Sequence, residues 1–180
     1  RAGTIGKVVP GYQAKVVDEN DQEVPRGTVG RLAVIGPTGC RYMDDERQTK
    51  YVSNGWNHPG DAFIQDEDGY FHYRARDDDM IITAGYNVGG PEVEDGLLTH
   101  QAVAECGVIG KPDAVRGMII KAFVVLKPGH PDNEAMVETL QAYVRDSIAP
   151  YKYPREIEFM AALPRTDTGK LQRFKLRGMA

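Results

Sequence analysis

The sequence has few cysteines, one tryptophan and no long hydrophobic run. Its two cysteines, Cys40 and Cys106, are too few for a disulfide framework and lack the close spacing of paired zinc ligands. Apolar runs such as 123–126 are far shorter than the roughly 20 residues that a membrane-spanning helix needs. These absences exclude a disulfide-rich scaffold and predict no membrane partner.

The chain begins at Arg1 without a methionine, and no basic and apolar secretory leader opens it. We therefore expect a piece cut from something longer, and a cytoplasmic location is the simplest expectation. With 41% hydrophobic and 27% charged residues, the 180-residue chain has the composition of one large globular domain or two small ones.

Charge is unevenly distributed along the chain. Residues 44–95 hold 13 acids and 4 bases, whereas residues 164–180 hold 5 bases and 1 acid, within a net charge of −4. A nucleic-acid domain usually has a wider basic face with aromatic platforms. The short basic tail therefore favours a small polyanion such as a nucleotide, and we expect no nucleic-acid partner.

Several familiar catalytic motifs are missing. The four histidines are scattered, none within metal-ligand spacing of a cysteine or another histidine, so the sequence predicts no metal ligands: His58, His72, His100 and His130. There is no Ser/His/Asp arrangement and no GxSxG elbow. The tripeptide Thr168-Gly-Lys170 is not the end of a Walker P-loop, because Pro164 and Leu171 occupy positions where that motif needs Gly and Ser or Thr.

The first part of the chain predicts strands and turns. Alternating apolar residues indicate strands at 12–17 and 31–35, and the strands expected at 62–65 and 70–74 flank a hairpin turn at 66–69. The polar stretch 44–52 predicts one or two helical turns. Residues 1–76 are thus predicted to form a β unit that is too small to be stable alone.

The second part predicts an α+β unit over 79–180. Strands are expected at 80–83, 103–110, 119–127 and 155–160, and helices at 91–100 and 132–149. A glycine-rich loop is expected from Ala84 to Gly90. The fold class is therefore α+β.

Three segments carry candidate chemistry. Gly60-Asp61 and Arg76 would meet on one rim of the sheet if the strands of the hairpin pair antiparallel. On that rim the carboxylate could accept hydrogen bonds from ribose hydroxyls, with the guanidinium donating beside it. The alternative is an ordinary Gly-Asp turn and a surface arginine. The strand, glycine turn and helix start over 83–94 would expose backbone N–H groups to a ligand, or be an ordinary connection. The loop 163–173 would deliver an ammonium to phosphate or carboxylate oxygens, or be merely solvated.

Together and in this order, the segments resemble motifs of the adenylate-forming superfamily of acyl-CoA synthetases, peptide-synthetase adenylation domains and luciferases. The matching motifs cover essentially the whole chain: Gly55-Trp56, Gly60-Asp61, Asp68-Gly-Tyr70, Arg76-Asp-Asp-Asp-Met-Ile81, Gly85, Pro91-Glu-Val-Glu94 and Pro164-Arg-Thr-Asp-Thr-Gly-Lys170. Residues 84–94 and 148–154 most resemble benzoate- and 2-aminobenzoate-CoA ligases. The sequence departs from the usual family pattern at three positions: it has Pro59 where the family has Thr, Ala75 where the family has Gly, and Ala84 where many members have Lys or Ser.

The resemblance implies a domain organisation. Residues 1–77 would be a small β-barrel-like subdomain at the tail of a large N-terminal domain, and 78–180 a mobile α+β lid. The phosphate loop and the acyl pocket of the family are missing from this sequence, so it resembles only the last third of such an enzyme. We expect the fragment to be inactive alone.

The resemblance also implies the nucleotide site. Asp61 and Arg76 match the residues that contact the ribose of ATP. Tyr73 falls where the family packs a side chain near the nucleotide, and Asn87 where some members place a phosphate-contacting polar residue.

The remaining implied roles concern motion and the second substrate. Asp78 matches the hinge about which the lid swings between the two half-reactions. Ala84, Gly85 and Tyr86 fall at the CoA site, with the Gly85 backbone against the pantetheine arm. Lys170 matches the mobile lysine that acts in adenylation.

The function so implied is that of an AMP-forming aromatic-acid–CoA ligase using ATP, Mg²⁺ and CoA. Its partners would be an aromatic carboxylic acid and the missing N-terminal domain of the same enzyme. Formation of a homo-oligomer is left open. The metal would be held mostly by the nucleotide and the missing part. Alternatives are a fatty-acyl-CoA synthetase, a peptide-synthetase adenylation domain, or a non-catalytic binding module with the lid fold.

Overall fold

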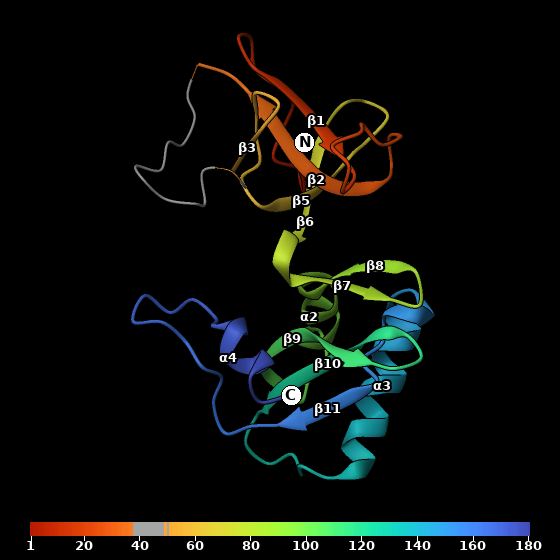
Figure 1. Cartoon of the computed structure of the whole chain (residues 1–180). Coiled ribbons are helices and arrows are strands. Elements are labelled where there is room, and N and C mark those ends of the chain that lie inside the picture. Colours follow the sequence, from red (N-terminus) through yellow and green to blue (C-terminus); the bar gives the residue numbers. More distant parts are fainter. Residues whose placement is uncertain (38–48, 50) are drawn as a thin grey trace. The chain divides into compact units, whose positions relative to one another are not determined.

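The computed structural model describes residues 1–37, 49 and 51–180 (Figure 1). The chain forms two compact units, an N-terminal unit at Arg1–Asp78 and a C-terminal unit at Asp79–Ala180. The helical turns expected over 44–52 lie largely outside the described residues. No helix in the described part is long and apolar enough to cross a membrane.

The N-terminal unit is one sheet in the order β3-β4-β2-β5-β6, with β1 paired to β2. Its strands are β1 (Gln13–Val17), β2 (Val29–Ile35), β3 (Val52–Ser53), β4 (Trp56–Asn57), β5 (Asp61–Gln65) and β6 (Phe71–Arg76). All strand pairs in the described part of this sheet are antiparallel. In the part of the chain described here, they do not close the sheet into a barrel, so the structure supports α+β architecture without the barrel expected from the resemblance.

The predicted hairpin at 62–74 is confirmed as β5 and β6. Asp66 organises its turn: the N–H groups of Gly69 and Tyr70 donate to the backbone oxygen and the carboxylate of Asp66, at 2.9 and 2.8 Å. Phe63 and Phe71 point into the core with Val16, and their rings meet edge to face at 6.4 Å. Packing on one side and a tight turn at the end fix the register of the two strands.

The C-terminal unit is a second sheet in the order β11-β10-β7-β8, with β9 paired to β10. Its strands are β7 (Met80–Thr83), β8 (Tyr86–Gly89), β9 (Val103–Asp113), β10 (Gly117–Leu126) and β11 (Glu156–Phe159). Its helices are α2 (Gly90–Leu98), α3 (Glu134–Ser147) and α4 (Arg173–Arg177). Short 3₁₀ turns, η1 (Asp77–Asp79) and η2 (Pro150–Lys152), flank these elements.

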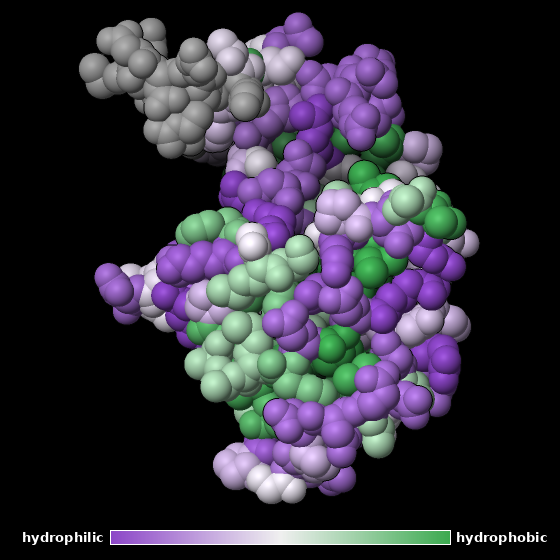
Figure 2. Space-filling model, turned by 60° about the horizontal axis from the view of Figure 1, so that its bottom comes forward, coloured by the Kyte–Doolittle hydropathy of each residue, from purple (hydrophilic) through white to green (hydrophobic). Residues whose placement is uncertain are grey.

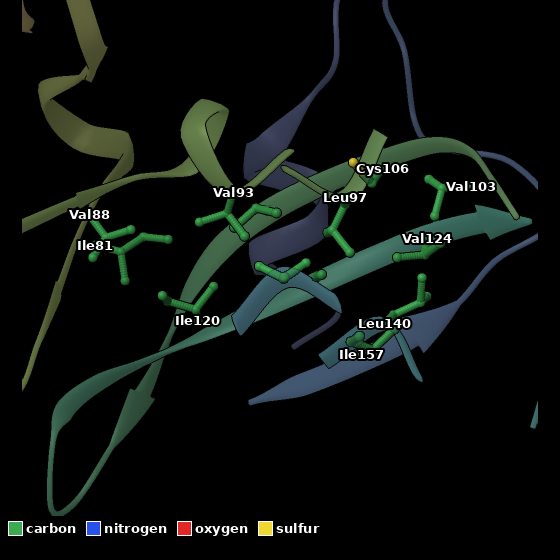
Figure 3. Packing of buried hydrophobic residues seen from close by; sticks show 13 residues of the cluster. Ile81, Val88, Val93, Leu97, Val103, Cys106, Ile120, Val124, Leu140 and Ile157 are labelled. Carbon is green, nitrogen blue, oxygen red and sulfur yellow. The ribbon is translucent and has the colours of Figure 1, made fainter. Parts of the chain in front are cut away.

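Side chains alternate across this second sheet and pack on both of its faces. On one face, Val124 of β10 joins Leu97 of α2 and Leu140 of α3 in the main core (Figure 3). Ala122 of β10 belongs to the same core. On the other face, Phe123 packs with Leu176 of α4 and with two further residues, Ile109 and Leu163. The period of two in β10 thus explains why α4 covers the face opposite to α2 and α3.

The prediction of a glycine-rich loop from Ala84 to Gly90 is wrong. Residues Tyr86–Gly89 form β8, which pairs with β7 through a two-residue turn at Ala84 and Gly85, both with positive φ, 49° and 83°. Gly90 is buried, and a Cβ there would lie 3.1 Å from the carbonyl oxygen of Val108. This glycine therefore permits close packing of α2 on β9 and does not mark a loop.

Candidate functional site

Asp61 and Arg76 face each other across the β5–β6 hairpin. They are register partners, and Arg76 Nη1 donates to Asp61 Oδ1 at 3.3 Å and to the backbone oxygen of Pro59 at 3.4 Å. A Cβ on Gly60, whose φ is 79°, would come within 3.1 Å of the Arg76 guanidinium. The prediction that antiparallel pairing brings Asp61 and Arg76 to one rim is confirmed.

This rim presents complementary polar groups to solvent. The Asp61 side chain is 28% exposed and that of Arg76 54% exposed. Carboxylate oxygens accept hydrogen bonds and a guanidinium only donates, so the pair is suited to vicinal hydroxyls beside a negatively charged group. Tyr73 lies on the same strand as Arg76, is 44% exposed, and meets Phe63 edge to face at 5.6 Å.

A pocket of about 560 Å³ adjoins the rim, and sequence reasoning did not find it. Its lining includes the loop before Asp61, the end of β6, and polar residues from the β1–β2 region: Glu19, Asp21, Arg31, His58, Pro59, Gly60, Arg76 and Asp77. No local motif connects Asp21 with His58, because the two come together only through the folding of the sheet.

His58 is the most buried polar residue of this pocket. It is 9% exposed, and both of its ring nitrogens lack a hydrogen-bond partner among the described residues. Burial lowers the pKa of the imidazole, although Asp21 lies 3.6 Å from its Nε2. The pKa of Asp21 is lowered in turn, chiefly by a hydrogen bond from the Ser53 hydroxyl at 2.6 Å.

Asp78 lies in the 3₁₀ turn η1, at the end of the N-terminal unit. Its side chain is 71% exposed, with Oδ1 3.9 Å from Arg76 Nε. The N–H of the preceding residue, Asp77, donates to the Gly60 carbonyl oxygen at 2.9 Å. The Asp78 carboxylate is therefore mostly exposed, and its ion pair among the described residues is a long contact within the same unit.

The β7–β8 turn carries the other candidates. Ala84 N–H donates to the Arg116 carbonyl oxygen at 2.9 Å, and a Cβ on Gly85 would meet no atom within 4 Å. Tyr86 stacks on Tyr151 with ring centroids 4.2 Å apart. Asn87, which follows Tyr86, is exposed. The Gly85 backbone is thus open to solvent beside an aromatic pair.

Large hydrophobic side chains form part of the exposed surface of the C-terminal unit. Figure 2 shows hydrophilic residues over much of the visible face, with hydrophobic areas between them. The large exposed hydrophobic residues of the C-terminal unit include Ile82, Tyr86, Val115 and Tyr151, which are 48%, 51%, 92% and 39% exposed.

Lys170 lies at the end of a tight, hydrogen-bonded loop. Thr166 N–H donates to the Lys170 carbonyl oxygen at 2.8 Å, and Lys170 N–H donates to Thr166 Oγ1 at 3.0 Å. Gly169 takes the left-handed conformation, with φ 83°. Lys170 is exposed, and its ammonium makes no hydrogen bond or ion pair within the described part of the chain.

The predicted residues are therefore divided between the two units. The N-terminal unit holds Asp61, Tyr73, Arg76 and Asp78; the C-terminal unit holds Ala84, Gly85, Tyr86, Asn87 and Lys170. Over residues 1–37, 49 and 51–180, no group of three His, Cys, Asp or Glu side chains is placed to hold a metal ion. These residues do not fit a Mg²⁺ site of their own.

Comparison with known proteins identifies the family. Residues 92–170 match the AMP-binding enzyme C-terminal domain, a match that ends at Lys170. The benzoate–CoA ligase of Thauera aromatica is 43% identical over 178 residues, which cover 97% of this chain and 34% of the relative. This chain belongs to the AMP-binding enzymes. Its residues 92–170 correspond to the C-terminal domain of that family.

Other AMP-binding enzymes show the same similarity. Acetyl-coenzyme A synthetase of Bacillus subtilis (strain 168) is 41% identical over 182 residues, covering 98% of this chain and 32% of the synthetase. The crystal structure of the anthranilate CoA ligase AuaEII in complex with anthranoyl-AMP has a TM-score of 0.85 and 41% identity, covering 100% of this chain and 35% of the ligase. The chain spans about a third of the length of these relatives.

Proposed function

We propose that this chain is the C-terminal third of an AMP-forming ligase that joins an aromatic carboxylic acid to CoA. The acid is converted with ATP to an acyl-adenylate and pyrophosphate, and the acyl group then passes to the CoA thiol with release of AMP. The N-terminal unit belongs to the tail of the large domain, with a barrel that the upstream chain completes. The C-terminal unit is the lid. We place the enzyme in the cytoplasm.

The observation that carries this proposal is the ammonium of Lys170, which makes no hydrogen bond or ion pair among the described residues, on its hydrogen-bonded loop. In the first half-reaction a carboxylate attacks the α-phosphate of ATP, so two anions must approach each other. A lysine held by its backbone, with its charge still available, offsets this repulsion as charge develops in the transition state. Preorganised charge of this kind typically contributes about 3–4 kcal/mol.

The Asp61–Arg76 rim has the chemistry needed to hold the ribose. The Asp61 carboxylate can accept from the 2′ and 3′ hydroxyls, while the Arg76 fork, already 3.3 Å from that carboxylate, keeps a donor beside the sugar. Tyr73 and Asn87 are proposed to contact the nucleotide from β6 and β8. We expect Mg²⁺ to be bound through the phosphates and the rest of the enzyme.

The second half-reaction requires a different surface at the same site. Thiolysis needs a channel along which the pantetheine arm of CoA can approach the acyl-adenylate. The β7–β8 turn at Ala84 and Gly85, which Tyr86 follows, has an open main chain at Gly85, as close approach of a ligand to the backbone requires. We propose that rotation at Asp78 presents Lys170 first and this turn second.

Aromatic specificity rests on sequence likeness. Residues 84–94 and 148–154 resemble benzoate- and 2-aminobenzoate-CoA ligases, and relatives named for benzoate and anthranilate are 43% and 41% identical. A synthetase named for acetate is also 41% identical. The acid itself would be selected by a pocket outside this chain, so benzoate and 2-aminobenzoate are the proposed substrates and short aliphatic acids are the alternative.

The test uses the full-length enzyme that carries residues 1–180. ATP–pyrophosphate exchange and CoA thioester formation are measured with benzoate, 2-aminobenzoate, octanoate and acetate. We expect exchange and thioester formation with the two aromatic acids at kcat/KM at least about tenfold above acetate, since a good apolar pocket discriminates by one to two powers of ten. Preference for an aliphatic acid would contradict the aromatic assignment, and absence of acid-dependent exchange with every acid would contradict the ligase assignment.

A further inference from the structure

Glu94 is the centre of an ion-pair cluster that anchors the chain just after Lys170. Arg173 Nη2 lies 2.7 and 2.6 Å from the two carboxylate oxygens of Glu94. Glu94 Oε1 also accepts the backbone N–H of Val108 at 2.8 Å. The Glu94 and Arg173 side chains are only 13% and 21% exposed. This cluster thus joins α2, β9 and the start of α4 in a place with little solvent.

Asp79 extends the cluster to the first residue of the C-terminal unit. Its Oδ2 lies 4.0 Å from Arg173 Nη1, its Oδ1 accepts from Arg177 Nη1, and its side chain is 13% exposed. Asp79 directly follows Asp78, the proposed hinge. The residue after the hinge is therefore tied by charge to α4, and α4 begins three positions after Lys170.

A second arginine–glutamate pair holds the other end of the same loop. Arg165 Nη2 lies 2.6 Å from Glu105 Oε2, and Arg165 Nη1 donates to the Gly169 carbonyl oxygen at 2.7 Å. This outer pair is more exposed, at 43% and 47%. Exposed pairs fix a geometry weakly, whereas a charge-assisted pair with little exposure fixes it firmly. The inner pair at Arg173 is therefore the stronger constraint on the loop.

We propose that Arg173 is a positioning residue for Lys170. This inference rests on the proposed function, because it assigns the cluster to the adenylation half-reaction. Arg173, held by Glu94 and Asp79, sets the direction in which the loop projects the Lys170 ammonium. Because Lys170 acts only in adenylation, weakening the cluster changes that half-reaction and leaves thiolysis unchanged.

The test is Arg173→Lys in the full-length enzyme. Lysine keeps the charge and loses the planar fork, which is not a conservative change at such a site. Lysine also lacks the Nε atom of Arg173, which is buried and has no hydrogen-bond partner among the described residues. Its removal breaks no hydrogen bond, so we expect no loss of stability from that atom. We expect the kcat of ATP–pyrophosphate exchange to fall about tenfold, with the KM for ATP unchanged, because a small displacement of a catalytic group is costly.

Two further variants separate positioning from a structural effect. Lys111→Gln removes the cation of a more exposed pair, with Glu156 at 2.8 Å, elsewhere in the same unit, and both half-rates should stay at the wild-type level. In a Lys170→Ala background, Arg173→Lys should cause no further loss of exchange, because it acts through a side chain that is already absent. Thiolysis of a supplied acyl-adenylate should be unchanged by Arg173→Lys.

The outcomes distinguish this inference from the proposed function. If the wild-type enzyme shows no acid-dependent exchange, the proposed function is wrong. If the wild type is active but Arg173→Lys leaves exchange unchanged, lowers exchange and thiolysis equally, or adds a further loss to Lys170→Ala, the positioning role is overturned while the ligase assignment stands.

Discussion

Thr166 and Lys170 are joined twice across the tip of their loop, once by each residue's backbone N–H, at 2.8 and 3.0 Å. One of these bonds uses the Thr166 hydroxyl as acceptor for the N–H of Lys170. The backbone of Lys170 is therefore held by a side chain four positions earlier, while its own side chain projects into solvent.

Thr166→Val should weaken this arrangement with little change in shape. The Lys170 N–H loses its acceptor, and a hydrogen bond of this kind contributes about 1 kcal/mol, so we expect about a fivefold fall in the kcat of ATP–pyrophosphate exchange. Thr166→Ser keeps the hydroxyl and is the matched control. Equal exchange rates in the Val and Ser variants would show that the hydroxyl does not position Lys170.

Arg76→Ala should weaken nucleotide binding more than it slows chemistry. The Asp61 carboxylate loses the guanidinium beside it, and the site loses a donor beside the ribose. We expect the KM for ATP to rise about tenfold with a smaller change in kcat, the pattern of a contact made equally in the ground and transition states. Lys7→Ala, which removes a cation lying over the Tyr70 ring in the same unit, should leave the KM unchanged. A fall in kcat alone would contradict a ribose contact.

Local patterns predicted those parts of the fold whose contacts are close in sequence. The hairpin β5–β6 followed from an Asp-Gly turn between alternating residues, and its pairing brought Asp61 opposite Arg76 as expected. Strand β8 was missed because its glycines suggest a loop, although Gly90 is required for close packing on Val108. Helix α4 has 5 residues, too few to show a helical period.

Long-range contacts explain most of what could not be predicted. Glu94 and Arg173 are 79 positions apart in sequence, and their pairing depends on how α2 and α4 lie against β9. Asp21 and His58 meet only after the sheet of the N-terminal unit has formed. No spacing rule relates such pairs, so the cluster behind Lys170 and the pocket beside Arg76 emerged only from the structure.

Asp78→Pro should separate the two half-reactions. Proline fixes φ near −65° and removes an N–H, so it restricts a backbone that must adopt two conformations. We expect one half-reaction to persist and the other to collapse. Asp132→Pro places the same residue in an exposed loop of the C-terminal unit and should leave both half-rates unchanged. Equal loss of both in the Asp78 variant, with folding intact, would count against a hinge there.

His58 should make the N-terminal unit less stable in acid. Because burial lowers the pKa of its imidazole in the folded chain, the unfolded chain takes up the proton first. The stability contribution of His58 is present above pH 6.5, the ordinary histidine value, and is lost as the pH falls through the lower pKa of the folded state. Urea unfolding followed by the fluorescence of Trp56, the one tryptophan, reports this unit.

His58→Gln removes the titrating group and should flatten this pH dependence between pH 7 and 5. His100→Gln is the control, because His100 has a pKa lowered by burial but belongs to the C-terminal unit. A Trp56 transition whose midpoint falls equally with pH in the wild type and in His58→Gln would show that the imidazole is not the source.

Lys170→Ala in the full-length enzyme, with the two half-reactions measured separately, tests the central claim most directly. Lys175→Ala, at an exposed residue of α4 five positions away, is the matched control. We expect ATP–pyrophosphate exchange to fall by about 10²–10³-fold with the KM for ATP and acid little changed, because the charge acts in the transition state. Lys170→Arg should restore only part of the rate, since a planar fork does not replace a compact ammonium. Thiolysis of a supplied acyl-adenylate should stay near the wild-type rate. Unchanged exchange in Lys170→Ala would contradict the account.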